Sequence, residues 1–140
     1  KMIAKMIIFI LLIFLNTVLI FIYKKWNEKP WIYLLFVPLL FIISTVIFLL
    51  FPKLYYTEKD FFLKILLSFM VILGINFIIP ISHHIINVII QFHEENNSEN
   101  INRNPIKFLI QNKERMKYIF TIIWFVLSLV MLSGNWFGKK

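Results

Sequence analysis

Four long apolar runs limit what this chain can fold into. They cover residues 6–23, 31–51, 61–81 and 118–137, and more polar stretches separate them. A hydrocarbon core of about 30 Å needs roughly 20 apolar residues in a helix, and a helix satisfies its own backbone groups inside lipid. The runs therefore predict an all-α integral membrane protein with about four transmembrane helices, in one polytopic domain over residues 1–140.

The composition supports this fold class and argues against several functions. Hydrophobic residues make up 60% of the chain, and there is no cysteine. Soluble domains are usually about 45–50% apolar, and without cysteine the chain has no thiolate nucleophile or thiolate metal ligand. The formal net charge is +8, but the basic residues lie in the polar gaps, where lipid headgroups would meet them. We expect the bilayer as a partner and no nucleic acid.

The residue usage also indicates an origin. Ile, Phe, Lys and Asn are abundant, whereas alanine occurs once, as Ala4. This bias is typical of AT-rich coding in a low-GC bacterium or an organelle genome. We therefore expect the mitochondrial inner membrane if the chain is organelle-encoded, and otherwise the bacterial cytoplasmic membrane.

The polar breaks carry aromatic side chains where a membrane interface would place them. Residues 23–31 read YKKWNEKPW, residues 51–60 read FPKLYYTEKD, and Trp136 and Phe137 close the last run before two lysines. Tyr and Trp are enriched at both membrane–water interfaces. Pro38 lies inside the second run, where membrane helices tolerate proline, and it predicts a kink rather than a break.

A polar stripe follows the third run, within and around ISHHIINVIIQF at residues 81–92. On one helix at about 100° per residue, polar side chains share a narrow arc or lie at its edge: Asn76, His83, His84, Asn87 and Gln91. This stripe suits a face against lipid headgroups or a partner subunit, or the lining of a pore. The adjacent histidines point about 100° apart instead of having the i, i+4 spacing of two metal ligands on one helix, so we expect no metal site and no cofactor.

Pro80 leaves two arrangements open for this stripe. Proline removes one backbone donor from a helix, so the third helix either continues past Pro80 with a kink or ends there. In the second case residues 82–93 would form a separate amphipathic helix in the interface plane.

Residues 93–117 form the one long polar segment. Its Asn-rich part predicts a loop, and Asn104 followed by Pro105 predicts a helix start with an asparagine cap. The short amphipathic helix after it would present an apolar patch outside the bilayer: Ile106, Phe108, Leu109 and Ile110. This patch predicts either a docking element for another subunit or a helix lying on the membrane surface.

Isolated polar residues within the four runs are most often hydrogen-bonding contacts between helices. They are Asn16, Thr17, Ser44, Thr45, Ser68, Asn76, Thr121, Ser128 and Ser133. The two asparagines are the most costly to bury, so each should have a partner. None of the runs contains a carboxylate, which proton-coupled carriers usually need.

These features favour two hypotheses about function. The first is a non-catalytic accessory subunit of a larger membrane complex, such as a respiratory complex, an ATP synthase or a bacterial secretion or export machine, with other membrane subunits as partners. The second is a small homo-oligomeric channel, transporter, holin-like or immunity membrane protein, in which the stripe from Asn76 to Gln91 lines the path. Because the spans contain so little reactive chemistry, we expect no enzyme activity and prefer the first hypothesis.

Overall fold

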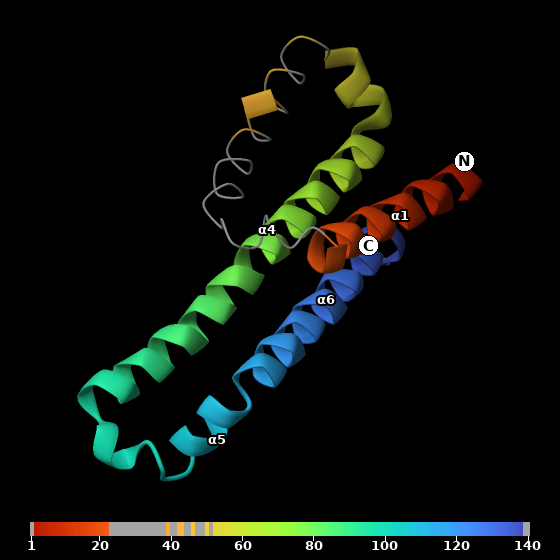
Figure 1. The fold of residues 1–140 in the computed structure, drawn as a ribbon. Helices are drawn as coiled ribbons and strands as arrows, with labels where there is room; N and C mark the ends of the chain where they lie inside the picture. Colours follow the sequence, from red (N-terminus) through yellow and green to blue (C-terminus); the bar gives the residue numbers. More distant parts are fainter. Residues whose placement is uncertain are drawn as a thin grey trace.

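The computed structural model describes residues 2–22 and 52–138, together with the single positions 39, 42, 43, 46 and 50. Every regular element in these parts of the chain is helical (Figure 1). The elements are α1 (Met2–Thr17), the π-helical turn η1 (Val18–Ile22), α4 (Pro52–Asn96), the 3₁₀ turn η2 (Ser98–Asn100), α5 (Ile106–Gln111) and α6 (Lys113–Phe137).

Three helical segments are long and apolar enough to cross a membrane: Met2–Ile22, Asp60–Asn96 and Lys113–Phe137. They correspond to the first, third and fourth apolar runs, and they fit an integral membrane location. The second predicted span, residues 31–51, lies almost entirely outside the described residues, as do the expected kink at Pro38 and the predicted contacts of Ser44 and Thr45.

Helix α1 changes its winding just after Asn16. The α-helical part ends at Thr17, and the chain continues through the π-helical turn η1. The Thr17 hydroxyl donates to the Ile13 carbonyl at 2.8 Å. This bond from a side chain to the preceding helical turn adds to the backbone hydrogen bonds where the winding changes. The neighbouring Asn16 side chain faces the other helices.

Helix α4 is 45 residues long and passes through Pro80 without ending. The alternative of a separate helix over residues 82–93 is therefore not what the chain adopts. Ser82 donates its hydroxyl to the Ile78 carbonyl at 3.0 Å, close to the point where the proline removes a backbone donor. At about 1.5 Å per residue, α4 is roughly 68 Å long, which is more than twice the thickness of a hydrocarbon core.

Helices α4 and α6 lie side by side and run in opposite directions, and α1 lies against them near the C-terminal end of α6 (Figure 1). Two apolar clusters hold the three helices together. The first cluster is built on Leu12, Ile72, Leu132 and Trp136. The second is built on Ile20, Ile75 and Ile79, with Trp124 and Phe125 packed against it. Edge-to-face contacts of Phe9 with Phe137 and of Phe21 with Phe125 add to the packing of α1 on α6.

The segment between α4 and α6 folds back over the far end of α4, where η2 and α5 lie (Figure 1). Helix α4 extends to Asn96, so the first four residues of the polar segment 93–117 are helical. The predicted asparagine cap is wrong: Pro105 precedes the first turn of α5, and no side chain caps it. Instead, the backbone amide of Leu109 donates to the Pro105 carbonyl at 3.1 Å, as in an ordinary first helical turn.

Candidate functional site

The main concentration of polar side chains is a series of hydrogen-bonded layers between α4 and α6, which we call the polar ladder. Its members are Lys64, Ser68, Asn76, Ser82 and His83 on α4, Thr121, Trp124, Ser128, Asn135 and Trp136 on α6, and Asn16 on α1. Apolar residues of the two clusters separate the layers. We take the polar ladder as the candidate functional site.

The first layer is centred on Ser68, whose side chain is fully buried. The Ser68 hydroxyl accepts from Trp136 Nε1 at 2.8 Å and from Asn135 Nδ2 at 3.0 Å, and it donates to the Lys64 carbonyl at 2.6 Å. Lys64 Nζ in turn donates to the Trp136 carbonyl in the last turn of α6, at 3.1 Å. A cation at a helix C-terminus is favourable because the unpaired carbonyls there carry partial negative charge. This layer fixes the end of α6 on α4.

The middle layer contains side chains from all three helices. Asn16 Nδ2 donates to Ser128 Oγ at 2.6 Å, and the Ser128 hydroxyl donates to the Phe125 carbonyl at 2.6 Å. Asn76 Nδ2 donates to the Ile72 carbonyl of its own helix at 2.8 Å. All three side chains of the layer have 0% exposure, as expected for groups in the centre of a bundle.

The position of Asn76 in this layer follows from the antiparallel register. Ser68 pairs with Trp136, and His83 pairs with Thr121. Counting eight residues on from Ser68 gives Asn76, and counting eight back from Trp136 gives Ser128. Counting seven residues back from His83 along α4 and seven on from Thr121 along α6 gives the same two residues. Asn76 therefore lies at the level of Ser128.

The third layer contains the hydrogen bond from Trp124 Nε1 to Ser82 Oγ, at 3.0 Å. Because a tryptophan ring nitrogen can only donate, it needs an acceptor wherever it leaves water, and Ser82 supplies one. Ser82 also donates to its own helix, so both groups of this pair are used. The two residues are half-buried.

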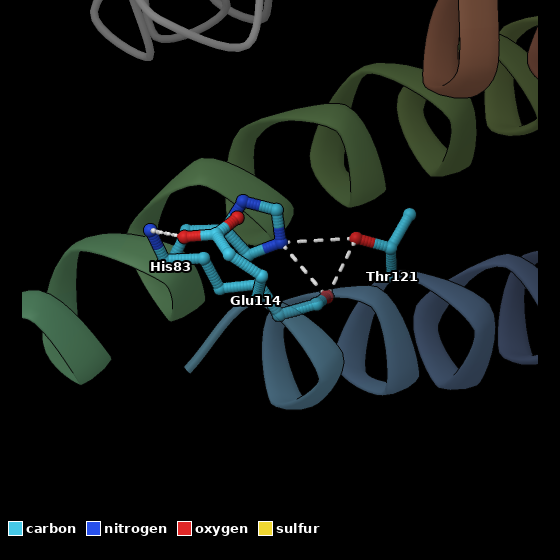
Figure 2. Close-up of polar contacts among 4 residues, drawn as sticks. His83, Glu114 and Thr121 are labelled. Atoms are coloured by element: carbon cyan, nitrogen blue, oxygen red, sulfur yellow. Dashed lines mark hydrogen bonds and ion pairs between the residues drawn. The ribbon is translucent and has the colours of Figure 1, made fainter. Parts of the chain in front are cut away.

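His83 forms the fourth layer with the N-terminal part of α6. Figure 2 shows its ring facing Thr121, with Nε2 3.0 Å from the Lys117 carbonyl oxygen and 2.9 Å from Thr121 Oγ1. A carbonyl oxygen only accepts, so the contact with Lys117 assigns the ring proton to Nε2. The Thr121 hydroxyl donates to the same carbonyl at 2.9 Å. Lys117 Nζ also pairs with the exposed Glu114 carboxylate at 3.4 Å.

The residues of the predicted polar stripe take different positions. Asn76 is fully buried, His83 and Asn87 are half-buried, and His84 and Gln91 are exposed. Gln91 donates to Glu95 on the same helix at 2.7 Å, while Asn87 Oδ1 is buried without a hydrogen-bond partner in the described chain. The structure thus directs the start of the stripe towards the α4–α6 interface and leaves its end outside.

The predicted docking patch is only partly exposed. Phe108 is 58% exposed, whereas Ile106, Leu109 and Ile110 are half-buried. Helix α5 touches both α4 and α6, which agrees with the partial burial of three of the four side chains. Whether this patch docks on a subunit stays a prediction.

No group of three or more His, Cys, Asp or Glu side chains is placed to hold a metal ion among the residues that the structure describes. The three histidines make separate contacts. His83 faces α6, His84 is exposed, and His93 Nδ1 lies 3.3 Å from Asn97 Nδ2 in the turn after α4. The polar ladder consists of amides, hydroxyls and indoles together with the Lys64 ammonium and the His83 imidazole, and most of its side-chain hydrogen bonds join one helix to another.

Sequence reasoning missed several members of the polar ladder. The sequence pattern alone gives Ser82, Trp124 and Asn135 no role, and Lys64 lies at the start of the third apolar run. The pattern places Trp136 at the membrane interface, whereas its side chain is 3% exposed. The available signal was the indole N–H, which needs an acceptor once it is buried. A serine near the same depth on another helix was its natural partner.

Comparison of the chain with protein-family models, with curated proteins and with solved structures finds no match.

Proposed function

We propose that this chain is a non-catalytic structural subunit of a larger membrane protein complex. The observation that carries the proposal is an apolar stripe on the outer face of α4, beyond the level at which α6 becomes polar. The stripe consists of Val88, Ile89 and Phe92, which are 47%, 42% and 57% exposed.

The level of this stripe follows from the register of the two helices. His83 is paired with Thr121, so counting on along α4 and back along α6 sets Val88 level with Met116, and Phe92 level with Asn112. The first turn of α6 between those levels carries Lys113, Glu114 and Arg115. A slab of hydrocarbon that contained the apolar stripe would also contain these charges, which is costly.

The exposed apolar side chains of α6 itself run from Tyr118 to Phe137. They extend about 29 Å along the helix at about 1.5 Å per residue, which matches a hydrocarbon core of about 30 Å. A bilayer that fits α6 therefore leaves the stripe of α4 outside. An exposed apolar surface outside lipid is typical of a site that contacts another protein, and we take another subunit of the complex as the occupant.

The use of the polar ladder supports a structural role over a conducting one. The Asn76 side chain forms a hydrogen bond within α4, and the His83 side chain bonds to α6. Both residues of the predicted polar stripe are therefore engaged inside the bundle, and His83 helps to hold it together. Between the layers lie Ile72, Ile79 and Leu132, which are at most 1% exposed. The alternative of a small self-assembling channel would need these helices to open.

The proposal is tested by a pair of matched double substitutions. Val88→Ala with Phe92→Ala shortens two side chains one helical turn apart in the apolar stripe. Val126→Ala with Val130→Ala does the same on α6, at a level inside the bilayer, where both residues are 50% or more exposed. Each chain is extracted from its native membrane in mild detergent and followed on native gels.

The variant with Val88→Ala and Phe92→Ala should stay folded, as judged by circular dichroism, but should bind its assembly on the order of tenfold more weakly. Losing the burial of a large apolar side chain costs about 1.5–3 kcal/mol, and about 1.4 kcal/mol is tenfold in affinity. The control variant should migrate like the wild type. Equal migration of both variants with the assembly would contradict the stripe as the contact.

A second variant addresses the channel alternative. His83→Leu with Asn87→Leu removes two polar side chains of the predicted pore lining. A pore should lose ion flux in reconstituted vesicles, whereas a structural subunit should show no flux in either form and lose assembly yield at most.

A further inference from the structure

The middle layer of the polar ladder contains two acceptors that the helices leave unused. Asn16 Oδ1 and Asn76 Oδ1 are buried, and neither has a hydrogen-bond partner in the described part of the chain. Both side chains are 0% exposed. A buried carbonyl oxygen without a donor is unfavourable, and buried polar groups in native proteins are nearly always satisfied by protein or by ordered water.

Hydrogen bonds on the nitrogen side fix the orientation of both amides. Asn16 Nδ2 donates to Ser128 Oγ at 2.6 Å, and Asn76 Nδ2 donates to the Ile72 carbonyl at 2.8 Å. Because each nitrogen is held, each oxygen points away from the group that its own nitrogen binds. Rotating the Asn76 amide would bring its oxygen next to the Ile72 carbonyl oxygen, which can only accept. Rotating the Asn16 amide would require the Ser128 hydroxyl to give up its bond to the Phe125 carbonyl.

The two oxygens belong to one layer. Leu12 and Ile72 lie in the same apolar cluster, and Ile20 and Ile79 lie together in the other. Asn16 falls between Leu12 of α1 and Ile20 of η1. Asn76 falls between Ile72 and Ile79 of α4. Both asparagines therefore lie between the same two apolar clusters, at the level of Ser128.

The chemistry of the layer selects a neutral donor. Asp and Glu are absent from residues 1–27, 61–93 and 115–140, so no carboxylate of these segments can balance a cation in the bundle centre, where an uncompensated charge is costly. A water molecule offers two O–H donors to two acceptors and is the usual group that satisfies buried polar atoms. We propose that the middle layer binds a water molecule that donates to both Asn16 Oδ1 and Asn76 Oδ1.

This water gives the middle layer a role that its side chains do not fill directly. The bond from Asn16 to Ser128 joins α1 to α6, while the hydrogen bond of the Asn76 side chain stays within α4. Water shared by the two oxygens extends the network from α1 to α4. The three helices are then linked at one depth, between two apolar clusters that shield the layer from bulk water.

The experiment is infrared difference spectroscopy of the full chain reconstituted in lipid vesicles, in H₂¹⁶O and in H₂¹⁸O. A water molecule held in a shielded site gives an O–H stretching band separate from bulk water, and this band shifts with the oxygen isotope. The wild-type chain should show such a band. A wild-type spectrum without any isotope-sensitive band of this kind would overturn the proposal, whatever the variants do.

Three variants assign the band. Asn16→Leu and Asn76→Leu each remove one of the two acceptors, and each should abolish the band. Asn87→Leu is the matched control, because Asn87 Oδ1 is also without a partner but belongs to a half-buried side chain outside the middle layer. This variant should keep the band. Persistence of the infrared band in both the Asn16→Leu and the Asn76→Leu chains would contradict the proposed site.

A double-substitution cycle tests whether one water serves both side chains. If it does, the factor by which Asn16→Leu changes the folding equilibrium should be at least about threefold smaller in the Asn76→Leu background than in the wild type. The reason is that the Asn76→Leu chain has already lost the water. Purely additive effects would contradict a shared water. Exchanging sodium chloride for choline chloride at equal ionic strength should leave the band unchanged, and a change would indicate a bound cation and overturn the proposal.

Discussion

Replacement of Ser68 by alanine is the sharpest test of the polar ladder as the device that pairs α4 with α6. The substitution removes one oxygen atom and raises the helix propensity slightly, as does the same change in the control variant below. It deprives Trp136 Nε1 of its acceptor at 2.8 Å and takes one of two acceptors from Asn135 Nδ2, which keeps the Lys64 carbonyl at 2.8 Å. The main consequence is therefore a single unpaired indole N–H.

The magnitude follows from the burial of this pair. An unpaired buried donor costs about 1–3 kcal/mol in proteins generally, while hydrogen bonds between membrane helices average about 0.6 kcal/mol and reach about 1.7 kcal/mol. Ser68 and Trp136 are 0% and 3% exposed, so water cannot readily replace the lost acceptor. We expect a destabilisation of about 1–2 kcal/mol, equivalent to a factor of about 5–30 in the folding equilibrium.

The assay is reversible unfolding in mixed micelles, followed by far-ultraviolet circular dichroism. Ser133→Ala is the matched control, because the Ser133 hydroxyl is exposed and donates only within α6, to the Val130 carbonyl at 3.0 Å. Its effect should stay within about 0.5 kcal/mol. Trp136→Phe in both backgrounds completes a cycle, in which the coupling between the two residues should be about 0.5 kcal/mol or more. Equal effects of the two serine substitutions would contradict the role of Ser68 as the buried acceptor that pairs α4 with α6.

Two further predictions concern the other end of the polar ladder. His83→Leu should destabilise the bundle by about 1 kcal/mol or less, which is less than the effect of Ser68→Ala. The Thr121 hydroxyl keeps its bond to the Lys117 carbonyl, so no buried group is left unpaired. The same unfolding assay checks this prediction, and a larger loss of stability would contradict it. Trp124→Phe removes the donor to Ser82 and should cost about 0.5–1.5 kcal/mol, whereas an unchanged midpoint would show that the indole bond contributes nothing.

The spans could be predicted from the sequence because the hydrophobic thickness of a bilayer sets the length of a membrane helix. Three of the four apolar runs form helices that meet this length, and the other run lies almost entirely outside the described residues. Asn16 and Asn76 could also be singled out, since burying an amide in lipid demands a partner. The expectation was only half met: both nitrogens are bonded, but both oxygens are unpaired within the described chain.

The pairing of the helices could not be predicted from one sequence. Lipid-facing and helix-facing side chains are both apolar in a membrane, so periodicity alone does not tell which face of α6 meets α4. Ser68 and Trp136 are 68 positions apart, and neither residue signals the other. The continuation of α4 through Pro80 was one of two open alternatives, because a proline removes a single hydrogen bond and neighbouring helices can stabilise the rest.

The placement of the amphipathic part was harder still. The helical wheel groups Asn76, His83 and Asn87 on one arc, but it does not say what that arc faces. In the structure Asn76 and His83 belong to the polar ladder, and the apolar side of the same segment carries the exposed Val88 and Phe92. The side of this helix that carries the proposed partner contact is therefore the apolar one.

The most direct measurement of the central claim is native mass spectrometry of the wild-type chain, extracted in mild detergent from the membrane that normally contains it. We expect the chain to appear in a large assembly together with unrelated subunits. Its appearance alone, or as a small homo-oligomer of this chain only, would contradict the role of an accessory subunit.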